Sequence, residues 1–169
     1  MSDNQLNNKP RIPAFKELLA QPVLMLGFGF GSGLAKKAPG TFGTLLGLLL
    51  FIPIVLWSEW LAWAVLIVAT AVGSYICGRS SELLNVHDHG GIVWDEFVGI
   101  WLVLLLLPEQ SWLFWGLAFL TFRLFDIWKP WPIKWIDEHI EGGFGIMLDD
   151  VLAAIYAISV IWIYQYWLL

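Results

Sequence analysis

The sequence predicts an all-α membrane protein, a polytopic helical bundle with about five spans and a short interfacial or re-entrant N-terminal helix. Three observations lead to this prediction. Hydrophobic residues make up 59% of the 169 residues and charged residues only 14%, against about 45–50% and about 25% in ordinary soluble domains. Mean hydropathy is +0.72. The 12 tryptophans are enough to supply the aromatic belts at both faces of a bilayer.

The same composition excludes several classes of protein. The chain is too apolar to be disordered, and its net charge of −5, without a basic stripe, argues against nucleic-acid binding. A single cysteine, Cys77, permits neither an intramolecular disulfide nor a cysteine-rich metal site. We expect a polar tail over residues 1–17, without a cleavable signal peptide, and one membrane-embedded catalytic domain over residues 18–169.

The first half of the chain predicts two full spans after a broken apolar segment. Residues 18–35 are uncharged, but one proline and four glycines interrupt them, which predicts a short helix and then a glycine-rich stretch at the membrane interface. Residues 38–58 are uncharged over 21 positions, long enough to cross about 30 Å of hydrocarbon. Residues 60–78 give a second span, and the polar residues 79–91 predict a loop with a helical start.

The third predicted span is unusual because its uncharged run is short. Residues 97–108 supply only 12 positions, about 18 Å of helix. To cross the hydrocarbon core the helix must begin near Gly91, which places Asp95 and Glu96 inside it, about one turn from its end.

The fourth span has the same property, and the fifth does not. A full-length helix that contains the uncharged residues 110–122 must also include Arg123 and Asp126. Residues 128–141, which contain two prolines and are rich in tryptophan and charge, predict a loop with a short interfacial helix. Residues 151–169 are uncharged and predict the last span, with two aspartates at its start.

The distribution of basic residues predicts the topology. With the N-terminus in the cytoplasm and five spans, all basic residues fall on the cytoplasmic side, whereas the other side holds only Glu59 and Glu109. The basic residues are Lys9, Arg11, Lys16, Lys36, Lys37, Arg79, Arg123, Lys129 and Lys134. We therefore expect a cytoplasmic N-terminus and an external C-terminus.

Charged side chains within spans are candidates for function, because each costs about 2.5–3.5 kcal/mol at mid-helix. Five carboxylates from three spans share one depth near the cytoplasmic side. They are Asp95, Glu96, Asp126, Asp149 and Asp150. Their mutual repulsion is most simply relieved by a divalent cation, and an all-oxygen ligand set suits Mg²⁺ better than Zn²⁺.

Groups that bind phosphate lie beside these acids in the sequence. Basic side chains, a Gly/Thr-rich helix start with free N–H groups, and a second glycine-rich loop all favour an anion. The candidates are Lys36, Thr41, Arg123, Lys129, Gly142 and Gly143. Metal-binding carboxylates with phosphate-binding cations are the parts of a phosphoryl-transfer site.

Structural roles remain open for several of these residues. Arg123 and Asp126 would also form a helix–helix ion pair, one of Asp149 and Asp150 a helix cap, and Lys36 only a topology signal. His87 and His89 are two apart in a loop; they fit a metal-binding pair, although solvated loop histidines are commoner. Two other functions also fit: an ion or proton transporter that uses the intramembrane carboxylates, and a non-catalytic lipid-binding subunit.

Four sequence blocks resemble, in order, the motifs of the phosphatidylglycerophosphatase A family. They are Ala38-Pro39-Gly40-Thr41-Phe42-Gly43-Thr44, Ile92-Val93-Trp94-Asp95-Glu96, residues 122–130 and residues 142–150. The resemblance covers about residues 25–160. It implies a Mg²⁺-dependent phosphatase of the bacterial inner membrane that converts phosphatidylglycerophosphate, made on the cytoplasmic leaflet, to phosphatidylglycerol and phosphate. Oligomeric state, and attack by water or by an aspartate, stay open.

Overall fold

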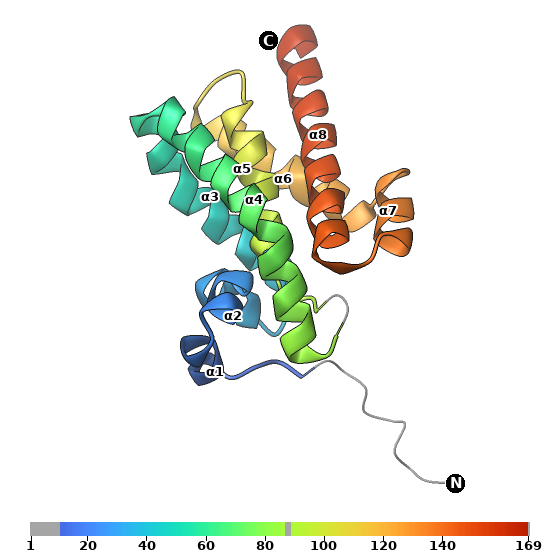
Figure 1. Ribbon diagram of the computed structural model, residues 1–169. Coiled ribbons are helices and arrows are strands. Elements are labelled where there is room, and N and C mark those ends of the chain that lie inside the picture. Colours follow the sequence, from blue (N-terminus) through green and yellow to red (C-terminus); the bar gives the residue numbers. More distant parts are fainter. Residues whose placement is uncertain (1–10, 87–88, 169) are drawn as a thin grey trace, which may run out of the picture.

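The computed structural model describes residues 11–86 and 89–168, and within these ranges its regular elements are all helices (Figure 1). In chain order they are α1 (Phe15–Ala20), α2 (Pro22–Gly27), the 3₁₀ helix η1 (Gly29–Leu34), α3 (Pro39–Trp57), α4 (Glu59–Leu84), α5 (Trp94–Leu105), α6 (Trp112–Trp128), α7 (Ile133–His139) and α8 (Gly142–Leu168). The all-α prediction is confirmed for the described residues.

Five helices form the bundle, and successive ones run in opposite directions. The starts of α3, α5 and α8 share one end of the bundle with the ends of α4 and α6 (Figure 1). Of these helices, α3, α4 and residues Gly142–Trp167 of α8 are long and apolar enough to cross a membrane. Helices α5 and α6 have 12 and 17 residues, about 18 Å and about 26 Å of helix. The structure thus supports three membrane-spanning helices rather than five.

The prediction that the third span begins near Gly91 is wrong, because α5 starts at Trp94. The residues before it are held in a loop: the N–H of Val93 donates to the carbonyl of Gly27 at 2.8 Å, and Val93 is buried. Asp95 and Glu96 therefore lie in the first turn of a short helix, where the helix dipole favours carboxylates.

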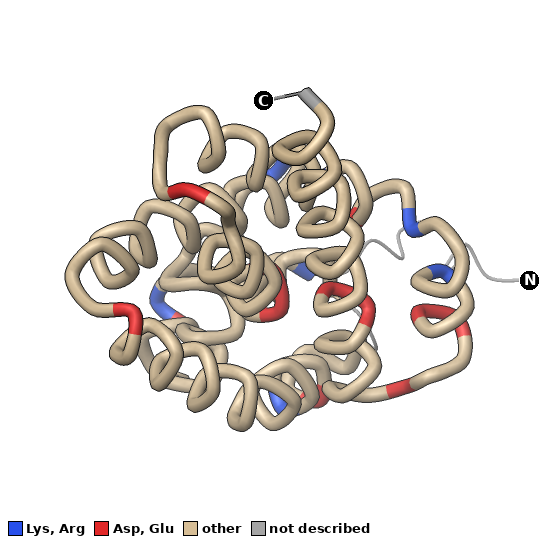
Figure 2. Tube along the Cα trace, turned by 90° about the horizontal axis from the view of Figure 1, so that it is seen from above, with Lys and Arg blue, Asp and Glu red and all other residues tan. Residues whose placement is uncertain are grey.

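Helix α5 occupies the centre of the bundle. Nine of its residues are buried, and Gly99 lets α6 approach, because a Cβ there would collide with the ring of Phe122. The outer helices keep large apolar side chains exposed: Leu49 of α3, Ile67 of α4 and Ile163 of α8 are each more than half exposed. Seen from above, charged positions are few along the trace (Figure 2). Apolar side chains on the outside of an apolar bundle are typical of a lipid-facing surface.

Exposed tryptophans mark both ends of the bundle. Trp57, Trp60 and Trp112 are 85%, 87% and 85% exposed at the end where α3 finishes. At the other end, Trp131 is exposed just before α7 and Trp135 is exposed on α7. Both lie in the segment predicted as a loop with a short interfacial helix. Two such belts fit the two interfaces of a bilayer.

The N-terminal segment is helical earlier than expected. Helix α1 begins at Phe15, inside the predicted tail 1–17, of which residues 1–10 lie outside the described ranges. The predicted short helix and glycine-rich stretch are present as α1, α2 and η1, in which Gly31 adopts a φ of 99°. These elements pack below the start of α3 and beside the end of α4 (Figure 1).

The last helix also begins earlier than predicted. Residues 142–145 form the start of α8 rather than a flexible loop, so Asp149 and Asp150 lie two turns inside the helix and not at its start. Gly143 explains the difference: a Cβ there would collide with the carbonyl oxygen of Ser74 on α4. The glycine allows the two backbones to touch, and this packing stabilises a helical start that glycine propensity disfavours.

Candidate active site

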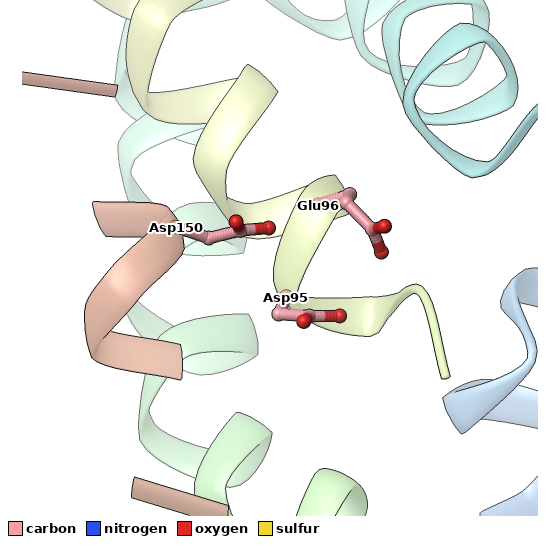
Figure 3. A group of neighbouring side chains, drawn as sticks. All are labelled: Asp95, Glu96 and Asp150. Carbon is pink, nitrogen blue, oxygen red and sulfur yellow. The ribbon is translucent and has the colours of Figure 1, made fainter. Parts of the chain in front are cut away.

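Three buried carboxylates meet where α5 and α8 pack together. Asp95 and Glu96 come from the first turn of α5, Asp150 comes from α8, and all three carboxyl groups turn to the same side (Figure 3). Each contributes one oxygen to a group in which all the oxygens lie within 4.8 Å of one another. We call these three residues the acid cluster. Like charges at this separation need a cation or protons to coexist.

The acid cluster fits a divalent cation. Within the described residues, Oε2 of Glu96 and Oδ2 of Asp150 are buried and have no hydrogen-bond partner. Carboxylate oxygens left in this state are costly, and a hard cation such as Mg²⁺ takes this type of ligand. The donor set therefore suits the predicted metal.

Arg123 links the cluster to α3 and α6. Its Nη1 atom lies 3.5 Å from Oε1 of Glu96, forms an ion pair with Asp126 one turn further along α6, and lies 3.3 Å from Oγ1 of Thr44. The carboxyl of Asp126 in turn interacts with that of Asp150. Thr44 donates to the carbonyl of Gly40 at 2.8 Å. Arg123 thus has both an ion-pairing role and a position beside the acid cluster.

Lys129 forms a second charged group at the end of α6. Its Nζ atom lies 2.7 Å from Oδ2 of Asp149 and 2.7 Å from Oδ1 of Asp137 on α7. Burial lowers the pKa of Lys129, but the two carboxylates more than offset this and raise its pKa above the ordinary value. The side chain is therefore a permanent cation at this end of the bundle.

The structure brings the five predicted acids, Arg123 and Lys129 to one end of the bundle, but the other candidates lie around them. Lys36 is exposed in the loop before α3, and Thr41 is half-buried, with its N–H donating to the carbonyl of Ala38 at 3.0 Å. Gly142 and Gly143 lie about two turns before Asp149, about 9–11 Å along the axis of α8.

Sequence reasoning missed Thr44 and Asp137, which bond to Arg123 and Lys129 respectively. It left the role of His89 open between metal binding and a solvated loop, and the structure shows that His89 is not solvated. His89 is buried, and its Nδ1 accepts a hydrogen bond from the N–H of Gly91 at 3.0 Å. His87 lies outside the described residues, so the pair stays untested as a metal ligand.

Comparison with known proteins identifies the family. The family model for phosphatidylglycerophosphatase A matches residues 25–165. The chain belongs to the phosphatidylglycerophosphatase A family. Membership confirms the resemblance predicted from the four sequence blocks and makes the chain a phosphatase.

Individual relatives agree with this family. A Haemophilus influenzae protein named phosphatidylglycerophosphatase A is 47% identical over 161 residues, which cover 93% of this chain and 97% of the relative. An Escherichia coli protein of the same name is 40% identical over 149 residues, 85% of this chain and 84% of the relative. A Bacteroides thetaiotaomicron relative, 36% identical over 83% of this chain and 91% of its own length, has a name that only proposes phosphatidylinositol-3-phosphatase activity. No solved structure matches the chain.

Proposed function

We propose that this phosphatase uses Mg²⁺ to remove the terminal phosphate of phosphatidylglycerophosphate, giving phosphatidylglycerol and inorganic phosphate. One observation carries the proposal: buried carboxylate oxygens within 4.8 Å of one another lie beside Arg123, which is 3.5 Å from Glu96. A cation-binding acid group next to fixed positive charge is what hydrolysis of a phosphomonoester requires. The names of the Haemophilus influenzae and Escherichia coli relatives support this headgroup.

The residues divide into two roles in this proposal. Asp95, Glu96 and Asp150 hold Mg²⁺, and Asp126 and Asp149 complete the acidic surroundings. Bound Mg²⁺ supplies charge neutralisation at the phosphate and a water of lowered pKa. One of the carboxylates accepts the proton of the attacking water, and a covalent aspartyl-phosphate is the alternative route.

Basic groups of the chain bind and orient the phosphate. Arg123 and Lys129 carry the charge that holds the phosphate oxygens. Lys36 and Thr41 are further candidates, because the loop that contains Lys36 leads to Gly40, which packs against Glu96 and Arg123. Gly142 and Gly143 remain candidates for backbone contacts at the mouth of the site.

We further propose that the protein lies in the bacterial inner membrane with this site at the cytoplasmic face. Eight of the nine basic residues belong to the described ranges, and they lie on or beside the elements at one end of the bundle. The positive-inside rule assigns such an end to the cytoplasm. A lipid phosphate in the cytoplasmic leaflet would then meet the acid cluster at headgroup depth.

The test is phosphate release by the purified protein in detergent, with Mg²⁺ titrated and EDTA as control. Asp95→Asn, Asp126→Asn and Asp150→Asn should each lower turnover at least about a hundredfold, the scale of losing one strong electrostatic contributor. Glu59→Gln, at the exposed start of α4, is the matched control and should turn over normally. Normal turnover by all three Asn variants, together with EDTA-resistant activity of the wild type, would remove the acid cluster from the mechanism.

A further inference from the structure

An apolar groove runs along the lipid-facing side of α4, next to α2 and α5. Its volume is about 390 Å³, and every residue that lines it is apolar. Helix α4 lines the groove from Ala64 to Ile76, about 18 Å of helix. One leaflet of the hydrocarbon core is about 15 Å deep, so the groove has the length of one leaflet. Val68 and Val72, on its wall, are 62% and 41% exposed. We call it the α4–α5 groove.

Two tryptophans of α5 line this groove, and the N–H groups of both indoles are hydrogen-bonded to backbone carbonyls. Nε1 of Trp94 donates to the carbonyl of Ala69 at 3.2 Å, and Nε1 of Trp101 donates to the carbonyl of Gly47 at 2.9 Å. Phe51 stacks on Trp101 with ring centroids 4.8 Å apart. Because both indole donors are used, the rings present a fixed surface of carbon to whatever lies in the groove.

One end of the groove adjoins the acid cluster on both of its walls. On α5, Trp94 lines the groove, and the next residue is Asp95. On α4, Ile76 lines it, and the next residue, Cys77, is buried within electrostatic range of all three acids of the cluster. On α5 the groove lining and the acid cluster are thus adjacent in the sequence, and on α4 the residue that follows the lining lies beside the carboxylates. A molecule with a phosphate at the acids and a hydrocarbon chain attached to it fits this arrangement.

We propose that the α4–α5 groove binds one acyl chain of the lipid substrate while the lipid's phosphate lies at the acid cluster. The inference rests on the proposed function and adds a second attachment point for the same molecule. Inside a bilayer there is no water to exclude, so the groove binds an acyl chain through van der Waals packing. A rigid surface and a groove of the same length as the chain favour this packing. Holding the chain orients the headgroup toward the acids, and orientation is a large part of catalytic rate.

The experiment fills the groove and compares chain lengths. Val68→Trp places a large ring in it, and dipalmitoyl and dihexanoyl phosphatidylglycerophosphate are assayed in the same detergent micelles. We expect the ratio of kcat/KM for the long-chain substrate to that for the short-chain substrate to fall at least about tenfold, the scale of altered methylene contacts in a pocket. Ile67→Trp is the matched control: the neighbouring residue of α4 is also exposed but lines a different groove, with Leu102 and Val151. Its ratio should equal that of the wild type.

The outcomes separate this proposal from the function on which it rests. A wild type that hydrolyses neither substrate overturns the proposed function. A wild type that hydrolyses both, with an unchanged ratio in Val68→Trp, overturns the groove, and a fall in Ile67→Trp alone assigns the chain to the other side of α4. An unchanged ratio with altered oligomeric state in Val68→Trp would assign the groove to a second copy of the protein.

A binding measurement covers the case in which Val68→Trp does not fold. Wild-type protein is irradiated with phosphatidylglycerophosphate that carries a diazirine in mid-chain, and the labelled peptides are identified by mass spectrometry. We expect labels within residues 64–76 and 94–101, at higher yield than with a photoreactive phosphatidylcholine of the same chain. Equal yields from the two lipids would mean that the groove holds bulk lipid only, and would overturn the proposal.

Discussion

The ammonium group of Lys129 lies 2.7 Å from a carboxylate oxygen of Asp149, and this contact joins the residue after α6 to the second turn of α8. A carboxylate oxygen of Asp137 on α7 also lies 2.7 Å from this ammonium group. A lysine has three N–H donors, so the two carboxylates leave one donor for a phosphate oxygen. The geometry thus allows Lys129 to be held in place and to bind substrate at once.

Replacing Lys129 by alanine should therefore impair both binding and rate. We expect Lys129→Ala to lower kcat/KM by about a hundredfold, with an increase in KM for the lipid phosphate. The matched control is Lys134→Ala: this lysine is 69% exposed on α7, 3.8 Å from Glu138, and its loss should change little. Equal kinetics in the two variants would exclude a phosphate-binding role for Lys129.

Gly40 provides a steric test of the same site. A Cβ at this position would collide with Oε1 of Glu96 and contact the guanidinium of Arg123. We expect Gly40→Ala to destabilise the protein by about 1–3 kcal/mol, as overpacking does, and to lower activity by displacing these groups. Gly116→Ala, where a Cβ meets nothing within 4 Å, is the control. Thermal unfolding in detergent and phosphate release on both variants decide the matter.

The lengths of the uncharged runs predicted which charged residues lie close together, but not which hydrogen bonds and ion pairs they form. The acids of α5, α6 and α8 share one depth because each lies next to an uncharged run of the sequence, at the same end of the bundle. The partner of Lys129 was not predictable, since Asp137 is eight residues away, beyond the turn containing Pro130 and Pro132. Likewise, the glycine-rich start of α8 resembles a loop in sequence, and its close approach to Ser74 of α4 depends on tertiary packing that the sequence does not show.

Arg123 has enough partners for its structural role to be measured separately from catalysis. Its guanidinium meets Glu96, Asp126 and Thr44 from three helices, and its side chain is only 13% exposed. Arg123→Ala should lower stability on the order of 3–5 kcal/mol, because it leaves buried carboxylates unpaired. Arg123→Lys restores the charge but not the fork geometry. If Arg123→Lys recovers the thermal stability and still lacks turnover, the residue acts on the phosphate as well; recovery of both limits it to structure.

Cys77 should be dispensable despite its position near the acids. The side chain is 0% exposed and packs in the core of the bundle, and a buried structural cysteine of this kind is chemically inert. We expect Cys77→Ser and Cys77→Ala to keep most of the phosphatase activity. Loss of turnover in a variant with unchanged thermal stability would restore a thiol nucleophile to consideration.

The topology prediction can be tested on the helices that are too short to span a bilayer in isolation. A cysteine-free Cys77→Ala background, carrying Glu59→Cys, Glu109→Cys or Asn85→Cys, is labelled in intact cells with a membrane-impermeant maleimide. Because α3, α4, α5 and α6 alternate in direction, residues 59 and 109 lie at one end of the bundle and residue 85 at the other. We expect labelling at 59 and 109 and protection at 85.

The second arm of this test concerns the C-terminus. A reporter fused after Leu169 should be external, since α8 runs in the same direction as α3 (Figure 1). Protection at Glu109→Cys with labelling at Glu59→Cys would mean that α5 and α6 form a hairpin that enters the membrane and returns, consistent with about 18 Å of helix in α5. A cytoplasmic reporter would be the more serious result. It would require an even number of crossings before the end of the chain, and the basic end of the bundle would then no longer identify the face on which the acid cluster meets its substrate.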